Sequence, residues 1–310
     1  MKTLYLDCFS GISGDMMIGA LLDIGGDPAW LKSELKKLQI DEEYELQWEK
    51  VVKNGITSTK FDVLLKDDHH HEHDHHHGHD HHHDHDHHHD HDHHHDHDHH
   101  HDHDHHHDHD HHHDHDHHHE HEHNHDHDHN HDHDHHHTHH HHHRTYKDIV
   151  KLIESADFSS EVTETALQIF KKIGEAEGHI HGVPLDKVHF HEVGAVDSII
   201  DIVGTAILIH QLEIKKVISS SIPVGTGRIR IDHGIYPVPA PATLEMLKGV
   251  PIEQSDVRFE LTTPTGAAIV AVLTEEFSTL PSMEVKAIGY GAGTKTFKDH
   301  PNVLRVVIGE

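Results

Sequence analysis

A continuous tract of histidine and acidic residues, 69–143, carries the least ambiguous chemical signal in the sequence. It holds 50 of the 57 histidines and 21 Asp or Glu residues, and HHHDHD or HHHEHE repeats every six residues from His81 to Glu122. Neutral imidazole binds nickel, zinc, copper and iron, and carboxylates between the rings add charge attraction. Because no position in a repeat is unique, the tract predicts metal storage or buffering rather than catalysis. Its predicted ligands include His81, His83, His85 and His87.

The tract should respond to pH and to metal. Imidazole has an ordinary pKa of about 6.5, so metal uptake should release protons and fail below roughly pH 5 to 6. The tract has no Lys, Arg or large apolar side chain, which predicts disorder in the absence of metal. The alternative interpretation is a cloning tag or a solvating spacer, although a tag is normally short, terminal and free of Asp.

A second set of candidate ligands lies in HFHEVGAVDSIIDIVG, residues 189–204. On an extended strand the two histidines point the same way, and two aspartates four residues apart share one helix face. Five ionisable groups beside an apolar helix suit a metal site or an acid/base site. The alternative is a solvated edge strand followed by a helix cap, and the zinc motif HExxH is absent. The predicted metal ligands are His189, His191, Glu192, Asp197 and Asp201, and Glu192 and Asp197 are also predicted to be catalytic.

Three further clusters could belong to the same site. In LDCFSGISGDM, a Gly/Ser loop between a strand and a helix offers backbone N–H groups to phosphate, and Asp15 is a candidate catalytic residue. In ELTTPTGAA, threonines precede a helix N-terminus, and in HGIYPVPAPAT the candidate catalytic residue His233 occupies a Gly turn. Each cluster alone also fits an ordinary turn, a capped helix or a structural histidine. The predicted cofactor-binding residues, which would hold a phosphate, are Ser10, Gly11, Ser13, Gly14, Thr263, Thr265 and Gly266.

The single cysteine, Cys8, excludes an intramolecular disulfide and a Cys-rich zinc module. It is either a thiolate nucleophile before a helix or a small core residue, and a free cysteine in a strand favours the core. The pair His179 and His181 either extends the metal-binding surface or simply ends a helix.

The elements that must position these residues alternate between strands and helices. Residues 3–9 predict a strand that leads into a helix, and Asn54-Gly55 predicts a hairpin between residues 44–53 and 56–66. The alternation predicts an α/β or α+β fold, with a mixed sheet and flanking helices. Further helices are predicted over residues 28–38, 145–155, 160–177, 195–212, 242–247 and 265–276, and strands over 188–190, 216–222, 283–290 and 303–308.

The tract divides the chain into three parts. Residues 1–66 and 144–310 are predicted to build one globular domain, and residues 67–143 form an insertion where a surface loop would lie. Such an insertion costs little, because loop-closure entropy grows slowly with length.

Charge and hydropathy exclude several classes of partner. The formal charge is −32, of which the tract contributes −21 and the remaining residues −11. Nucleic acids and anionic membranes attract basic surfaces, so neither is expected as a partner. The longest apolar run, residues 198–212, is too short to span a bilayer, and no secretory signal follows Met1. A cytoplasmic protein is therefore predicted.

Taken together, six segments resemble the LarC family, the nickel-insertion proteins of nickel-pincer nucleotide synthesis. They are LDCFSGISGDM, HFHEVGAVDSIIDIVG, HGIYPVPAPAT, ELTTPTGAA, GYGAGTKTF and NVLRV. The resemblance covers essentially the whole chain outside the tract, and a His-rich insertion after the first hairpin is also similar to the family. It implies insertion of Ni²⁺ into pyridinium-3,5-bisthiocarboxylic acid mononucleotide, with one metal–carbon bond and two metal–sulfur bonds formed in a CTP-dependent reaction.

The resemblance also implies partners. The product is the cofactor of lactate racemase and related enzymes, so apo-enzymes of that type are expected downstream. Family members usually continue into a C-terminal portion that carries CTP binding, which implies a C-terminal LarC polypeptide as a partner. Mg²⁺ or Mn²⁺ is a candidate accompanying ion.

The resulting hypothesis has two tiers. The tract gathers Ni²⁺ and passes it by ligand exchange to a defined site of His189, His191, Glu192 and Asp197. Glu192 or Asp197 takes the proton that leaves the pyridinium ring. Two alternatives use the same residues: a nickel storage or chaperone protein without catalysis, and a metal-dependent phosphohydrolase.

Overall fold

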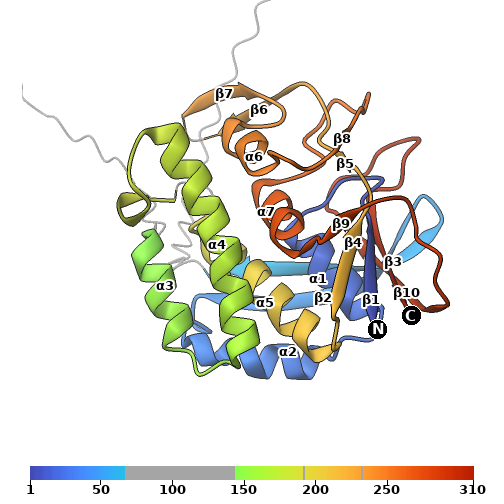
Figure 1. The fold of residues 1–310 in the computed structure, drawn as a ribbon, viewed down its shortest axis with the longest axis horizontal. Coiled ribbons are helices and arrows are strands. Elements are labelled where there is room, and N and C mark those ends of the chain that lie inside the picture. Colours follow the sequence, from blue (N-terminus) through green and yellow to red (C-terminus); the bar gives the residue numbers. More distant parts are fainter. Residues whose placement is uncertain (67–143, 191–192, 232) are drawn as a thin grey trace, which may run out of the picture. The chain divides into compact units, whose positions relative to one another are not determined.

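The computed structural model describes residues 1–66, 144–190, 193–231 and 233–310, with the elements labelled in Figure 1. The described residues on both sides of the tract belong to one compact unit. The predicted disorder and metal ligation of the tract, including His81, His83, His85 and His87, concern residues outside the described ranges, as do His191 and Glu192. The domain boundaries drawn from the sequence stay a prediction.

A seven-stranded mixed sheet joins early, middle and late parts of the chain, in the order β2-β3-β10-β11-β1-β4-β9. β1 lies between antiparallel β11 and parallel β4. β3, which precedes the tract, pairs in parallel with β10. The strands are β1 Thr3–Asp7, β2 Tyr44–Lys53, β3 Ile56–Leu65, β4 Lys216–Ser219, β9 Glu276–Phe277, β10 Val285–Ala292 and β11 Val303–Gly309.

Two two-stranded sheets also form. β5 (Ile222–Pro223) pairs in parallel with β8 (Ile252–Glu253). β6 (Arg228–Ile231) and β7 (Gly234–Pro237) make an antiparallel hairpin. This hairpin had not been predicted, although the alternation of Arg and Ile in β6 is a period-two signal.

The helices pack against the sheet in layers (Figure 1). α1 lies against β3, β10 and β11, α5 packs on α1, and α4 packs on α5 and α7. Leu4 and Leu6 of β1 join the buried apolar residues of the helices in one core, as do Leu304, Val306 and Ile308 of β11. The helices are α1 Gly14–Asp23, α2 Pro28–Leu35, α3 Tyr146–Glu154, α4 Ser160–His181, α5 Val196–Gln211, α6 Pro241–Met246 and α7 Pro264–Leu273, with short 3₁₀ turns η1 Lys36–Leu38 and η2 Leu185–Lys187.

Helix α5 is apolar nearly all the way round because it is packed between α1 and α4. A helix buried on several sides needs apolar residues on several faces. The carboxylates of Asp197 and Asp201 are exceptions to that pattern, and both lie in its first two turns. A buried carboxylate is costly unless something compensates it, so Asp201, whose Oδ1 is buried, points to a site.

The predicted fold class is confirmed, with a mixed sheet and flanking helices. The hairpin around Asn54-Gly55 forms, and so do the helices predicted on either side of the tract. The strand predicted over residues 188–190 is wrong, because His189 makes only an isolated bridge to Thr145. The helix predicted over residues 265–276 ends early, since Glu275 N–H donates to Val217 C=O and the chain turns into β9.

Within the described ranges, no helix combines the length and apolar character that crossing a bilayer requires.

Candidate functional site

A cavity of about 480 Å³ opens where the N-terminal ends of α1, α5 and α7 meet β3. Five carboxylates line it, and so do five hydroxyl groups. The carboxylates are those of Asp15, Asp62, Asp197, Asp201 and Glu260, and the hydroxyl groups are those of Ser13, Ser198, Thr263, Thr265 and Thr294.

Two loops are fastened together beneath the cavity. Ile12 N–H donates to Leu261 C=O and Thr263 N–H donates to Ile12 C=O, each over 3.1 Å. Gly11 has a φ of +83°, and a Cβ there would lie 2.0 Å from the Leu261 oxygen. A Cβ on Gly266 would likewise lie 2.0 Å from the Ile12 oxygen. Glycine at both positions therefore lets the starts of α1 and α7 lie side by side.

The three helix N-termini offer different numbers of donors. The N-cap residues of α1 and α5, Ser13 and Ala195, make no side-chain capping bond. In α7, Thr263 Oγ1 accepts from Gly266 N–H over 3.2 Å. First-turn N–H groups have no acceptor within their own helix, and the helix dipole favours an anion near them. The helix N-termini therefore favour an anionic group such as a phosphate, whereas the five carboxylates that line the cavity oppose one.

One buried cation balances part of the negative charge. Lys60, only 8% exposed, donates to Asp15 Oδ2 over 3.0 Å, to Phe61 C=O over 2.8 Å and to Asp62 Oδ1. Burial opposes its charge, but the neighbouring Asp15 and Asp62 carboxylates outweigh burial and raise the pKa of Lys60. Lys60 thus stays charged and holds two of the five carboxylates in place.

Lys60 compensates Asp201 only in part, because its charge lowers the pKa of Asp201 less than burial and the neighbouring aspartates raise it. Its Oδ1 is buried and has no hydrogen-bond partner among the described residues. Burial, and then the charges of Asp15 and Asp197, raise the pKa of Asp201 well above its usual range. A buried polar atom without a partner carries a desolvation cost, so its retention calls for a functional explanation.

The apo-protein should become more stable when Asp201 is replaced. A carboxyl group with a raised folded-state pKa binds more protons in the folded than in the unfolded chain, so stability falls as pH rises above about 4. Asp201→Asn removes this loss, and we expect a gain of about 1 kcal/mol at neutral pH. Thermal unfolding of parent and variant in a chelator, from about pH 4 to 8, measures the difference, which should widen with pH.

Asp197→Asn is the matched control for this stability measurement. The Asp197 side chain is exposed, and its Oδ1 accepts from Ser198 N–H over 2.7 Å in the first turn of α5. The loss of a negative charge near a helix N-terminus should destabilise slightly, by about 0.5 kcal/mol. An Asp201→Asn protein that melts below the parent at neutral pH would contradict the argument.

The structure brings some of the residues predicted from the sequence to this cavity. Ser13, Gly14, Asp15, Asp197, Asp201, Thr263 and Thr265 line it. Lys60 packs beside the cavity, Asp62 and Glu260 line it, and none of the three had been predicted as a site residue. The spacing of two between Lys60 and Asp62 on an amphipathic strand was a signal that could have identified them. Glu260 lies within ELTTPTGAA, the segment that supplied the threonines.

Other predicted residues lie elsewhere. The buried Ser10 hydroxyl contacts His300 Nε2 over 2.8 Å and Pro301 C=O. Gly11 and Gly266 lie where the loops before α1 and α7 approach each other closely. His189 is exposed and bridges to Thr145. His233 is exposed, with its ring centroid 5.2 Å from that of His181.

Cys8 is fully buried, and burial raises its pKa to about 12. A buried thiol with a raised pKa is a poor nucleophile, so the core interpretation accounts for it.

In the described part of the chain, no three His, Cys, Asp or Glu side chains already surround a common point closely enough to hold a metal ion. A cation in the cavity would therefore need donors beyond those already grouped there, from a ligand or from a side-chain movement.

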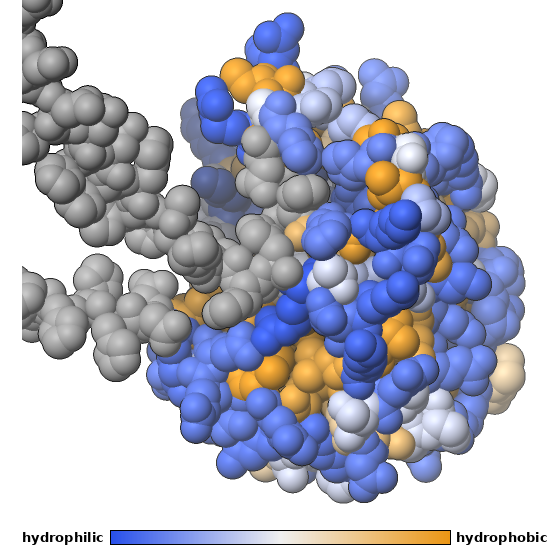
Figure 2. Space-filling model, turned by 90° about the vertical axis from the view of Figure 1, so that its left-hand side faces the viewer, coloured by the Kyte–Doolittle hydropathy of each residue, from blue (hydrophilic) through white to orange (hydrophobic). Residues whose placement is uncertain are grey.

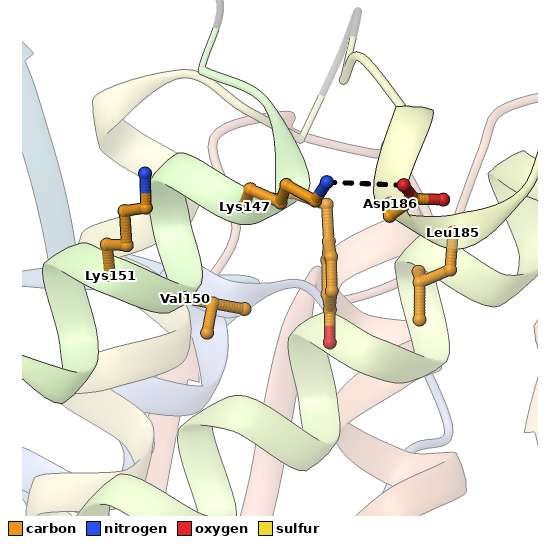
Figure 3. Close-up of a pocket in the computed structure, with 6 residues that line it drawn as sticks. Lys147, Val150, Lys151, Leu185 and Asp186 are labelled. Atoms are coloured by element: carbon orange, nitrogen blue, oxygen red, sulfur yellow. Dashed lines mark hydrogen bonds and ion pairs between the residues drawn. The ribbon is translucent and has the colours of Figure 1, made fainter.

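A second cavity of about 390 Å³ lies between α3 and η2 (Figure 3). Val150 and Leu185 form much of its wall, and Lys147 pairs with Asp186 over 3.2 Å. Figure 2, which looks onto the side carrying α3 and α4, shows hydrophobic residues gathered among hydrophilic ones. Its one carboxylate, that of Asp186, is already paired, so this cavity offers no group of carboxylates for a metal ion.

Comparison with known proteins shows a match along nearly the whole chain. Residues 4–310 match a family model described as nickel insertion protein. The chain is 46% identical to a pyridinium-3,5-bisthiocarboxylic acid mononucleotide nickel insertion protein of Geobacillus kaustophilus, with 100% of the chain and 60% of the relative covered. Proteins of the same name from Clostridium acetobutylicum and Staphylococcus epidermidis are 46% and 39% identical, over 100% and 99% of this chain and 64% and 59% of their own lengths.

The chain thus spans about 60% of the length of these curated relatives. No solved structure matches it.

Proposed function

Because this chain belongs to the nickel insertion protein family, we propose that it takes part in inserting Ni²⁺ into pyridinium-3,5-bisthiocarboxylic acid mononucleotide, the substrate in its relatives' names. The observation that carries the proposal is the cavity, where three helix N-termini and five carboxylates meet. Its volume of about 480 Å³ lies within the usual range for small-molecule sites.

The charges of the cavity favour a nucleotide together with a dication. Five carboxylates and one lysine would repel a bare phosphate, even beside helix N-termini. A divalent cation reverses this balance, because it is attracted to the carboxylates and then attracts the phosphate in turn. Ni²⁺ is itself a substrate of the proposed reaction, so one bound Ni²⁺ ion would both balance the carboxylates and attract the phosphate.

The substrate would supply several of the metal's donors. Each of its two thiocarboxylate groups offers a sulfur atom, so the protein need contribute only one or two carboxylates. This small number of protein ligands agrees with the structure, because no three His, Cys, Asp or Glu side chains in the described residues are grouped closely enough to hold a metal ion. Of the five metal ligands predicted in residues 189–204, Asp197 and Asp201 line the cavity. His189, His191 and Glu192 remain predicted ligands.

The chemical step exchanges one bond for another. A ring C–H bond breaks, a carbon–nickel bond forms, and the proton must pass to a base. Of the residues predicted to be catalytic, Asp15 and Asp197 line the cavity. Asp15 is tied to Lys60 and Ser13, whereas Asp197 is exposed to an incoming ring. We therefore assign proton acceptance to Asp197 and charge placement to Asp15.

The other expectations from the sequence stay predictions. They are the delivery of Ni²⁺ by the tract, the CTP requirement with Mg²⁺ or Mn²⁺, the C-terminal LarC polypeptide, the lactate racemase-type recipients and the cytoplasmic location.

The test is reconstitution. The chain is mixed with Ni²⁺ and the mononucleotide, with and without CTP, Mg²⁺ or Mn²⁺, and the C-terminal part of a longer relative. Mass spectrometry should detect a nucleotide that has gained one nickel and lost the ring proton.

Two outcomes would overturn the proposal. Nickel held by the protein with no nickelated nucleotide under any condition would indicate a storage or chaperone protein. Release of phosphate from the nucleotide without nickel transfer would indicate a phosphohydrolase.

A further inference from the structure

A second group of potential metal ligands lies away from the cavity, where the end of α4 meets the β6–β7 hairpin (Figure 1). Glu177 and His181 are four residues apart in the last two turns of α4, so they share one helix face. His233 comes from the connection between β6 and β7. Two elements far apart in the sequence therefore bring their imidazoles to one carboxylate.

The three side chains are close together. His181 Nε2 lies 3.3 Å from Glu177 Oε2, and the ring centroids of His181 and His233 are 5.2 Å apart. The Glu177 side chain is only 12% exposed, while that of His181 is 33% exposed. Burial raises the pKa of Glu177, although the two histidines act in the opposite direction. A largely buried carboxylate thus lies against one imidazole, that of His181, and the His233 ring lies next to that imidazole.

An ordinary helix end accounts for part of this arrangement. A histidine in the last turn interacts favourably with the helix dipole and with a glutamate one turn earlier. That explanation does not require a second imidazole from the hairpin. Two imidazoles and one carboxylate form a donor set suited to first-row transition metals.

We propose that Glu177, His181 and His233 bind one transition-metal dication such as Ni²⁺, at a site separate from the cavity. The three donors do not yet surround a common point, as is true of all such groups in the described residues. The metal must therefore turn the rings, and both belong to side chains with access to solvent.

The experiment uses the full-length chain with all 50 tract histidines replaced by asparagine, so that the tract no longer dominates binding. Ni²⁺ alone is titrated at neutral pH by calorimetry, without nucleotide. We expect His181→Ala, His233→Ala and Glu177→Gln each to weaken one Ni²⁺ site at least about tenfold. Circular dichroism confirms that each variant is folded.

His210→Ala is the matched control, because His210 is also an exposed histidine in the last turn of a helix, α5. It should leave Ni²⁺ binding unchanged. The inference fails if the His181→Ala and His233→Ala proteins titrate like the His210→Ala protein, or if the asparagine-tract chain binds no Ni²⁺. Loss of the site on Asp201→Asn but not on His181→Ala would assign it to the cavity, which overturns this inference and leaves the proposed function standing.

Discussion

In the proposed reaction, replacing Asp197 and Asp201 together by asparagine should lower the rate of nickel insertion into the mononucleotide by about 100-fold or more. The amides keep the size of the side chains but cannot ionise, so the cavity loses two of its five carboxylates. Both the attraction for Ni²⁺ and the assigned proton acceptor disappear, while Lys60 keeps its ion pairs with Asp15 and Asp62. The initial rate of formation of the nickelated nucleotide, followed by mass spectrometry, measures the effect.

Asp186→Asn is the control, because it makes the same chemical change at the other cavity, between α3 and η2. Its rate should match that of the parent chain. Total nickel uptake should be the same in all three proteins, since the tract is unchanged. A double variant that retains more than about a third of the parent rate would exclude the assigned roles of Asp197 and Asp201. A tenfold loss of rate corresponds to about 1.4 kcal/mol of activation free energy.

Gly11→Ala should destabilise the fold by about 3 kcal/mol and weaken nucleotide binding. The new Cβ would be placed 2.0 Å from the Leu261 oxygen, on a residue whose φ is +83°. The loop before α1 would then have to separate from the loop before α7, and the hydrogen bond from Ile12 N–H to Leu261 C=O would be lost. Urea denaturation measures the change in the free energy of unfolding.

Gly182→Ala separates the two causes. Gly182 also has a positive φ, +66°, but a Cβ there would meet no atom within 4 Å. The conformational strain alone should cost about 1 kcal/mol. If Gly11→Ala costs no more than Gly182→Ala, the close contact between the two loops does not contribute to stability as argued.

Local structure was largely readable from the sequence, because its causes lie within a few neighbouring residues. Asn54-Gly55 supplies the two positive φ angles of the turn between β2 and β3. Asp27 caps α2 by accepting from Ala29 N–H over 2.8 Å, and Pro28 follows at the first helical position. The spacing of four between Asp197 and Asp201 put both on one side of α5, and both line the cavity.

The sequence did not predict which side chains from distant segments contact one another. Lys60 reaches Asp15, and Asp62 pairs with Lys60, because β3, which precedes the tract, joins the sheet beside β10 and packs against α1. The pairing of His181 with His233 depends on where the β6–β7 hairpin lies against α4. Such contacts join residues tens to hundreds of positions apart, and no periodicity or turn signal encodes them.

The sequence by itself determined the chemistry available to this protein: an imidazole-rich tract, a family signature in six segments, and aspartates and threonines at the starts of helices. Only the tertiary structure decided which of them meet. It placed Asp15, Asp197, Asp201 and Thr263 in one cavity and left His189 and His233 elsewhere. The physical reason is that residue type and spacing fix local conformation, whereas sheet order and helix packing, driven by burial of the common apolar core, bring distant side chains together.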